Sequence, residues 1–172
     1  MNIPETYVYL VRARRDLWTT MERVSDDVLS RQLLNGPRLH SIKDLVAHVA
    51  TVEDVWIHDV ILRNPPIRKT MPALKDAAWW NPVYAGFALK TLLDYWRLVV
   101  QSTLTYLAIL TDDELKRIVS VHDAPEERYT VDSLLWHVMI HEVRHRAQIA
   151  VLLRTQGVEP PWLDLKNYLP FA

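Results

Sequence analysis

Residues 133–154 read S-L-L-W-H-V-M-I-H-E-V-R-H-R-A-Q-I-A-V-L-L-R, in which apolar residues recur at helical spacing around three histidines. His137, His141 and His145 follow one another at intervals of four residues. Four residues of α-helix turn through about 400°, so neighbours in this series lie one above the other on one face. Two neutral imidazoles one turn apart can bind one divalent ion. Because two imidazoles in an apolar face need polar partners that a helical core rarely supplies, the pattern favours a metal site over histidines that only fill a core.

The composition indicates one globular domain, which we expect to span residues 1–172. Of the 172 residues, 49% are hydrophobic and 24% are charged, which is enough for a core without disulfides or other covalent staples. The net charge of −1 argues against a nucleic-acid partner, since such proteins carry a basic excess. The chain has no cysteine to act as nucleophile or ligand, and its three glycines form no phosphate-binding loop.

The sequence also argues against a membrane partner. No apolar run approaches the length that spans a bilayer, and the N-terminal M-N-I-P-E-T-Y lacks the basic and apolar regions of a signal peptide. We therefore expect a cytoplasmic protein.

Four long amphipathic patterns predict four long helices, at residues 4–24, 41–62, 82–110 and 132–156. Ser41, with Asp44 three residues later, is typical of a helix start, and so is the pair Asn81-Pro82. Short helices are expected at 26–34 and 112–118, a brief extended segment at 119–122, and a polar turn at 123–128. No strand-length alternation competes with the helices, so the sequence predicts an all-α four-helix bundle with long crossover connections.

The connection at residues 63–81 contains the pair Trp79-Trp80. A loop of this length in a compact domain is usually functional or packs as a lid. Two adjacent tryptophans cannot both point inward from one regular element, so one of them is a candidate for a pocket mouth or a dimer surface. Simple packing of the connection is the favoured interpretation.

A further histidine, His48, lies on the inward face of the second predicted helix. Bundles build metal sites from inward side chains on facing helices, so we expect His48, His141 and His145 to bind one divalent ion. Three nitrogen ligands leave a position open for substrate, as in catalytic zinc sites. His137 lies two turns from His145 and about 80° around the helix, so it is not expected to share that ion. We interpret it as a residue that supports the ligands, lines a pocket or packs in the core.

Residues 141–149, H-E-V-R-H-R-A-Q-I, resemble the H-E-x-x-H-R-G-Q-I segment of the DinB-like superfamily of metal-binding four-helix bundles. Residues 44–50, D-L-V-A-H-V-A, resemble the histidine motif on the second helix of that family, and P-P-W-L-D at 160–164 resembles its ending. The resemblance covers nearly the whole chain. One departure is Ala147, where glycine is common, and a helix tolerates alanine better than glycine.

The resemblance implies a fold and a ligand set, and it points to a reaction. The superfamily includes bacillithiol S-transferases and a mycothiol-dependent maleylpyruvate isomerase, and its name comes from induction by DNA damage, which implies a stress response. The expected function is a metal-dependent transferase that attaches a low-molecular-weight thiol to a small electrophile. A divalent cation lowers the pKa of a bound thiol or water. Because the chain has no cysteine, the sulfur would come from a cosubstrate.

Glu142 is the candidate catalytic residue, because it directly follows a predicted ligand and could act as a base or support the ligands. The alternative is an ion pair with Arg146, four residues further on, on the outer face of the helix. Gln148 is expected to bond near the site.

Two other functions remain open. A small-molecule metallo-hydrolase would use a hydroxide bound by the three histidines, and a non-catalytic protein would only bind the metal. H-E-V-R-H also matches the zinc protease motif. A protease is less favoured, because only Glu159 and Asp164 could supply its third ligand and no sheet is expected to bind a peptide.

The expected cofactor is a divalent transition metal, zinc or nickel before iron or copper, since three imidazoles suit all of these ions. The expected partners are a small-molecule substrate and a second copy of the chain. The homodimer is implied by the tryptophan-containing connection and by the habit of the family.

Overall fold

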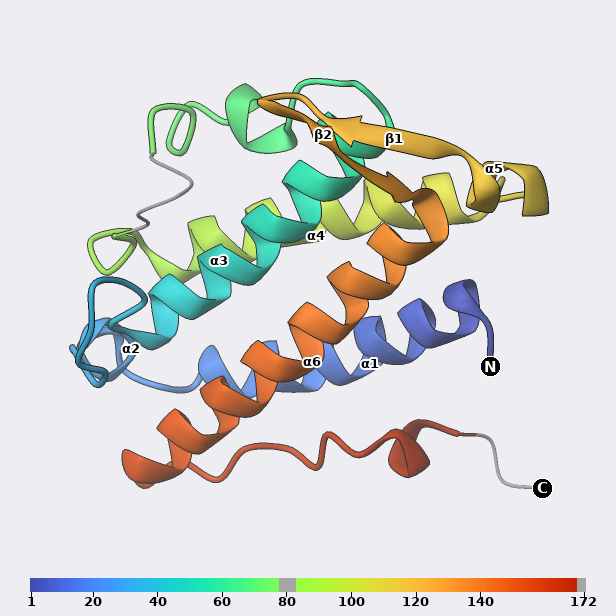
Figure 1. Ribbon diagram of the computed structural model, residues 1–172. Coiled ribbons are helices and arrows are strands. Elements are labelled where there is room, and N and C mark those ends of the chain that lie inside the picture. Colours follow the sequence, from blue (N-terminus) through green and yellow to red (C-terminus); the bar gives the residue numbers. More distant parts are fainter. Residues whose placement is uncertain (78–82, 170–172) are drawn as a thin grey trace.

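The four long helices expected from the sequence are present in the computed structural model, which describes residues 1–77 and 83–169. They are α1 (Ile3–Met21), α3 (Ile42–Asp54), α4 (Leu89–Leu107) and α6 (Val131–Thr155). Helix α3 packs against α4 and α6, and α1 packs against the same two helices (Figure 1). The all-α bundle is thereby confirmed. Within the described residues, no helix is long and apolar enough to cross a membrane.

The order of the helices requires one connection to return along the bundle. Helices α3 and α4 run in the same direction in Figure 1, so the chain returns along the bundle between them. This connection contains the short helix η2 (Ile67–Thr70). The pairs Trp79-Trp80 and Asn81-Pro82 lie outside the described residues.

Side-chain caps fix where the helices begin. The Ser41 hydroxyl accepts from the backbone N–H of Asp44, and the Asp44 carboxylate accepts from the N–H of Ser41, so the predicted capping box is confirmed. Asn2 and Glu5 form the same arrangement at α1. Thr130 caps α6, so the helix that carries three histidines starts at a defined residue.

Helix α3 continues directly into a wider π-helical segment, η1 (Val55–Ile61). His58 lies in it and is buried. Its Nδ1 lies 2.9 Å from Asp54 Oδ1 and its Nε2 lies 2.6 Å from Ser102 Oγ. The wider turn thus brings this imidazole to two polar partners, one in its own helix and one in α4.

Two local predictions were wrong. Helix α4 begins at Leu89, not at residue 82, because residues 83–88 form turns and loop. Residues 118–130 form an antiparallel hairpin of β1 (Ile118–Val121) and β2 (Ala124–Thr130), where only a brief extended segment and a polar turn were expected. The hairpin follows the short helix α5 (Asp112–Lys116) and leads directly into α6.

The remaining elements lie at the ends of the bundle. Helix α2 (Asp26–Ser30) precedes α3, and η3 (Leu165–Tyr168) lies in the C-terminal tail against α1. Tyr9 holds the tail, because its hydroxyl donates to the carbonyl oxygen of Leu163 at 2.7 Å.

Candidate metal centre

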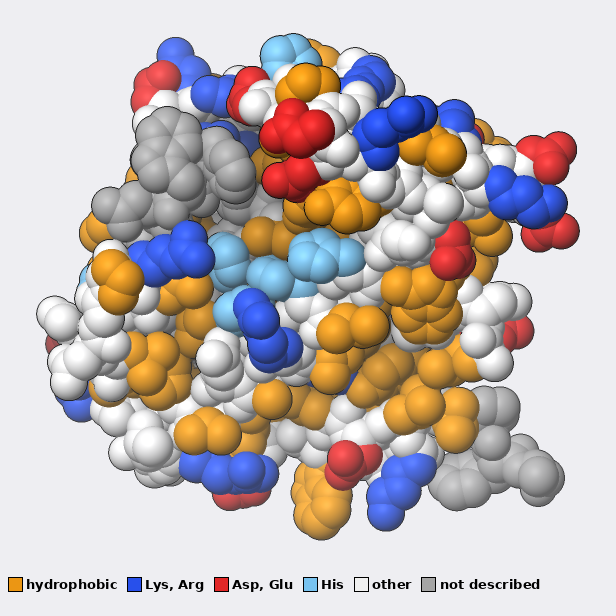
Figure 2. Space-filling model, in the orientation of Figure 1, with side chains coloured by type: hydrophobic (Ala, Val, Ile, Leu, Met, Phe, Trp, Pro, Cys, Tyr) orange, Lys and Arg blue, Asp and Glu red, His pale blue; other side chains and the backbone are white. Residues whose placement is uncertain are grey.

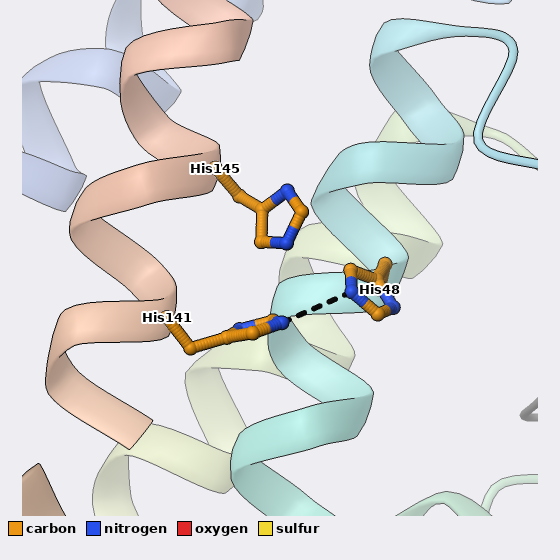
Figure 3. A group of neighbouring side chains, drawn as sticks. All are labelled: His48, His141 and His145. Carbon is orange, nitrogen blue, oxygen red and sulfur yellow. Dashed lines mark hydrogen bonds between the residues drawn. The ribbon is translucent and has the colours of Figure 1, made fainter. Parts of the chain in front are cut away.

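His48, His141 and His145 converge between two helices. Figure 3 shows His48 on α3 turned toward His141 and His145 on α6. The Nε2 atoms of His48 and His141 are 3.1 Å apart. One ring nitrogen from each of the three residues lies within 4.8 Å of the others, so the group could hold a metal ion. The sequence-based expectation that these three imidazoles meet is therefore confirmed.

The donor set fits a divalent transition metal. Two nitrogens bound to zinc at tetrahedral angles lie about 3.3 Å apart, which is close to the 3.1 Å between His48 and His141. Among the described residues, the group contains three nitrogen donors and no carboxylate. Three protein ligands leave a coordination position for a small molecule.

The imidazoles are in the neutral form that binds metals. Burial, together with the charges of His145 and the nearby arginines, lowers the pKa of His48 to about 4. Burial and the neighbouring histidines lower the pKa of His141 to about 3. Burial also lowers the pKa of His145. Near neutral pH the three rings therefore present lone pairs, and protons do not compete with a metal for them.

Gln148 orients the ring of His145. Its Oε1 lies 2.6 Å from His145 Nδ1, and a carbonyl oxygen can only accept, so Nδ1 carries the proton. Nε2 of His145 then keeps the lone pair, which is the arrangement that partners of metal-binding histidines usually impose. The expected bond of Gln148 near the site is thus present. Nε2 itself accepts from Nη2 of Arg144 at 3.0 Å.

His137 lies next to the group but is not part of it. Its ring centroid is 5.9 Å from that of His141 and 5.4 Å from that of Trp56. Trp56 in turn lies 6.3 Å from Tyr129 of β2. His137 is exposed and connects the three histidines to an aromatic group made by η1 and the hairpin, so it is not a core residue.

Glu142 has a partner that the sequence did not reveal. It is buried, and its two carboxylate oxygens accept from Nε and Nη2 of Arg14 in α1. The same Nη2 lies 3.2 Å from Glu53 of α3. The suggested ion pair with Arg146 on the outer face was wrong, because Arg146 is buried and donates to the hydroxyl of Tyr9. With both oxygens engaged by Arg14, the geometry does not favour Glu142 as a base.

The histidines are accessible from one side. Figure 2 shows them together on the face toward the viewer, with Lys or Arg side chains on two sides of them. His145 is buried, whereas His48 and His141 are half-buried. A small molecule can therefore reach the open side of the group from solvent.

The model of the DinB family matches residues 1–172. The chain belongs to the DinB family. In the solved structures, a conserved protein from Enterococcus faecalis is similar in fold, with a TM-score of 0.69 and 17% identity over 90% of this chain and 96% of that chain. A DinB-like protein from Bacillus cereus ATCC 10987 gives a TM-score of 0.59 and 19% identity over 93% of this chain and 94% of that chain. No functionally curated protein matches the sequence.

These comparisons agree with the geometry. The two similar structures show the fold, and family membership together with the three-histidine group indicates a metal-binding DinB-like protein. The resemblance noted in residues 44–50 and 141–149 is thereby confirmed at the level of the family.

Proposed function

We propose that this DinB-family protein is a metal-dependent thiol S-transferase that joins a low-molecular-weight thiol to a small electrophile. The observation that carries the proposal is a group of three neutral imidazoles with one side open to solvent. The resemblance to superfamily members that use such thiols supports the choice of reaction, and the absence of cysteine means that the sulfur comes from a cosubstrate.

The residues have distinct parts in this proposal. His48, His141 and His145 hold the ion, and Gln148 fixes the ring of His145 through Nδ1. A bound divalent ion lowers the pKa of a thiol at its open position, so that the thiolate is present near neutral pH. In the transfer the thiol loses its proton to solvent, the sulfur forms a bond to the electrophilic carbon, and the leaving group departs with its electron pair. Glu142 acts through Arg14, by fixing the position of α6.

We also propose the cofactor, the substrate class and the cellular location of the reaction. The cofactor is zinc or nickel, the substrate is a small molecule, and the protein works in the cytoplasm in a stress response. Metal analysis of protein purified without an affinity tag identifies the ion.

The decisive experiment combines metal content with thiol transfer. Protein with metal, a panel of thiols and chlorodinitrobenzene should release chloride at a thiol-dependent rate well above that of the metal-free protein. His48→Ala should lose both the metal and this rate. His122→Ala is the matched control, because His122 is exposed on the hairpin and should leave both unchanged. A metal-loaded protein with no thiol-dependent rate contradicts the transferase, and ester or amide hydrolysis by the same protein would favour the hydrolase.

We also propose that the protein forms a homodimer through the outer face of α6. The support is a row of exposed apolar side chains on a helix whose other face is buried: Ile140, Val143 and Val151. A helix that is apolar on both faces is usually covered on both. Val143→Glu should halve the mass measured by light scattering, whereas Val8→Glu, at an exposed position on α1, should not. A monomeric wild-type protein at micromolar concentration contradicts the dimer.

A further inference from the structure

Two arginines flank the histidines without a charged partner of their own. Arg144 lies on α6, and Arg38 lies in the segment before α3; both are exposed. Among the described residues, neither has a carboxylate within ion-pair distance, whereas several other arginines of the chain have one. Figure 2 shows Lys or Arg side chains on two sides of the histidines. The open side of the site is therefore positive even before an ion binds.

Arg144 forms a hydrogen bond with the nitrogen of His145 that would bind a metal. Its Nη2 donates to Nε2 of His145, which holds the lone pair because Nδ1 carries the proton. A nitrogen lone pair cannot accept a hydrogen bond and bind an ion at the same time. Metal binding at this nitrogen therefore releases the guanidinium of Arg144, and the positive ion repels it from its present position.

The backbone that follows Arg38 is held in a fixed turn. The next residue, Leu39, has a φ of 60°, which is uncommon for a residue other than glycine, asparagine or aspartate. Leu39 packs against the core, and the backbone N–H of His40 donates to Asp44 at 3.1 Å. The carbonyl oxygen of His40 accepts from the N–H groups of Leu33 and Leu34. These contacts hold Leu39 in its strained conformation and fix the backbone next to Arg38.

The positive charges at the site favour an anionic ligand. Three neutral ligands leave the two charges of a divalent ion uncompensated, and the two arginines add to them. Guanidinium groups match the planar geometry of a carboxylate, with which they form two parallel hydrogen bonds. A molecule that bears a thiol and a carboxylate a few bonds apart can bind the ion through its sulfur and an arginine through its carboxylate.

We propose that Arg144 and Arg38 form a carboxylate-binding rim over the histidine site, and that Arg144 becomes available to the ligand when a metal takes Nε2 of His145. This inference rests on the proposed function for its metal site and names the class of thiol that the site selects, an anionic thiol with a carboxylate near its sulfur.

The test compares two thiols on protein loaded with Co²⁺, whose visible absorption changes when sulfur binds. The probes are 3-mercaptopropionate, which carries a carboxylate, and 2-mercaptoethanol, which carries no charge. The wild-type protein should bind 3-mercaptopropionate about tenfold more tightly than 2-mercaptoethanol. Arg144→Gln should remove most of this preference, Arg144→Lys should keep part of it, and Arg38→Gln should reduce it.

Arg154→Gln is the matched control, because Arg154 is an exposed arginine further along the same helix. It should leave the preference unchanged. A second readout needs no thiol: Arg144→Gln should bind Co²⁺ several-fold more tightly than the wild type, because no guanidinium competes for His145. A merely structural role for Arg144 would not raise metal affinity.

The outcomes separate this inference from the function on which it rests. Equal binding of the two thiols by Co²⁺-loaded wild-type protein, or an unchanged preference in Arg144→Gln, overturns the carboxylate rim and leaves the metal site intact. Unchanged or weaker Co²⁺ binding by Arg144→Gln overturns the release of Arg144. Failure of the wild type to bind Co²⁺ overturns both the rim and the proposed transferase. A clear preference without any thiol transfer supports the rim and contradicts the transferase.

Discussion

Arg14 connects three helices of the bundle through one buried guanidinium. It comes from α1 and contacts Glu53 of α3 and Glu142 of α6. The guanidinium also lies 4.6 Å from the ring centroid of Trp96. Burial alone would lower the pKa of Arg14, but the two carboxylates raise it well above its ordinary value. Since Glu142 directly follows a predicted ligand, this contact fixes the helix on which two of the three histidines lie.

Replacing Arg14 with methionine should therefore be strongly destabilising. The change leaves two buried carboxylates without their cation, and breaking a buried ion pair in this way costs about 3–5 kcal/mol. Urea denaturation of the metal-free protein measures the loss. Arg15→Met, next in sequence but exposed, should change the free energy of unfolding by less than about 0.5 kcal/mol. Equal effects of the two substitutions would contradict the role of Arg14.

The histidines should make the metal-free protein sensitive to acid. In the folded protein the pKa of His48 is about 4 and that of His141 is about 3, both below the ordinary value of 6.5. When the pH falls through about 6.5, the unfolded chain takes up protons that the folded protein does not, so the free energy of unfolding decreases.

Denaturation curves from about pH 7 down to about pH 4 check this sign. The stability of the wild type should fall over this range more steeply than that of His48→Ala, whereas His122→Ala should follow the wild type. Parallel curves for the wild type and His48→Ala would show that His48 keeps its ordinary pKa.

At the scale of the helices and strands, the sequence predicted features that depend on neighbouring residues. It did not predict features that depend on contacts between residues distant in the sequence. The periodicity of apolar residues placed α6 nearly to the residue, and the same periodicity with the cap at Ser41 placed the start of α3, because these signals are local. The hairpin was missed because β2 reads A-P-E-E-R-Y-T, a mostly exposed strand without alternation. The start of α4 was misplaced because Asn81-Pro82 is typical of a helix start.

The candidate site likewise contains features that the sequence predicted and features that it did not. The meeting of the three histidines could be predicted, because a helical core seldom holds several histidines at helical spacing on apolar faces unless they bind an ion. The partner of Glu142 could not be predicted, since Arg14 lies 128 positions away in the sequence. Only the packing of α1 against α6 brings the two charges together.

The cap of α3 should contribute measurably to stability. The Ser41 hydroxyl accepts from the N–H of Asp44 in a buried position, so Ser41→Ala should cost about 1 kcal/mol. Thr111→Ala removes the equivalent bond from α5, a five-residue helix with no buried residues, and should cost less. Thermal or urea unfolding measures both, and a larger loss for Thr111→Ala would contradict the importance of the α3 cap.

At the scale of the whole molecule, the three histidines come from distant parts of the chain. His48 and His141 are 93 positions apart, so an unfolded chain must close a long loop to present both to one ion. A metal that binds only the folded protein stabilises it by about 4 kcal/mol at a free concentration a thousand times its dissociation constant.

Added Zn²⁺ should therefore raise the unfolding temperature of the wild type and leave that of His48→Ala nearly unchanged. Mg²⁺, which prefers oxygen ligands, is the matched control and should have no effect on either protein. An equal rise for the wild type and His48→Ala would mean that the ion binds elsewhere.

The contact of Trp56 with His137 has a practical consequence. An indole emits light, and the intensity of that emission depends on the groups in contact with its ring. With its ring 5.4 Å from His137, Trp56 is placed to report events beside the metal ligands as a change in fluorescence. The difference in emission between the wild type and Trp56→Phe isolates this signal from that of the remaining tryptophans. The protein thus carries its own optical probe, and ligands can be screened against it without a label.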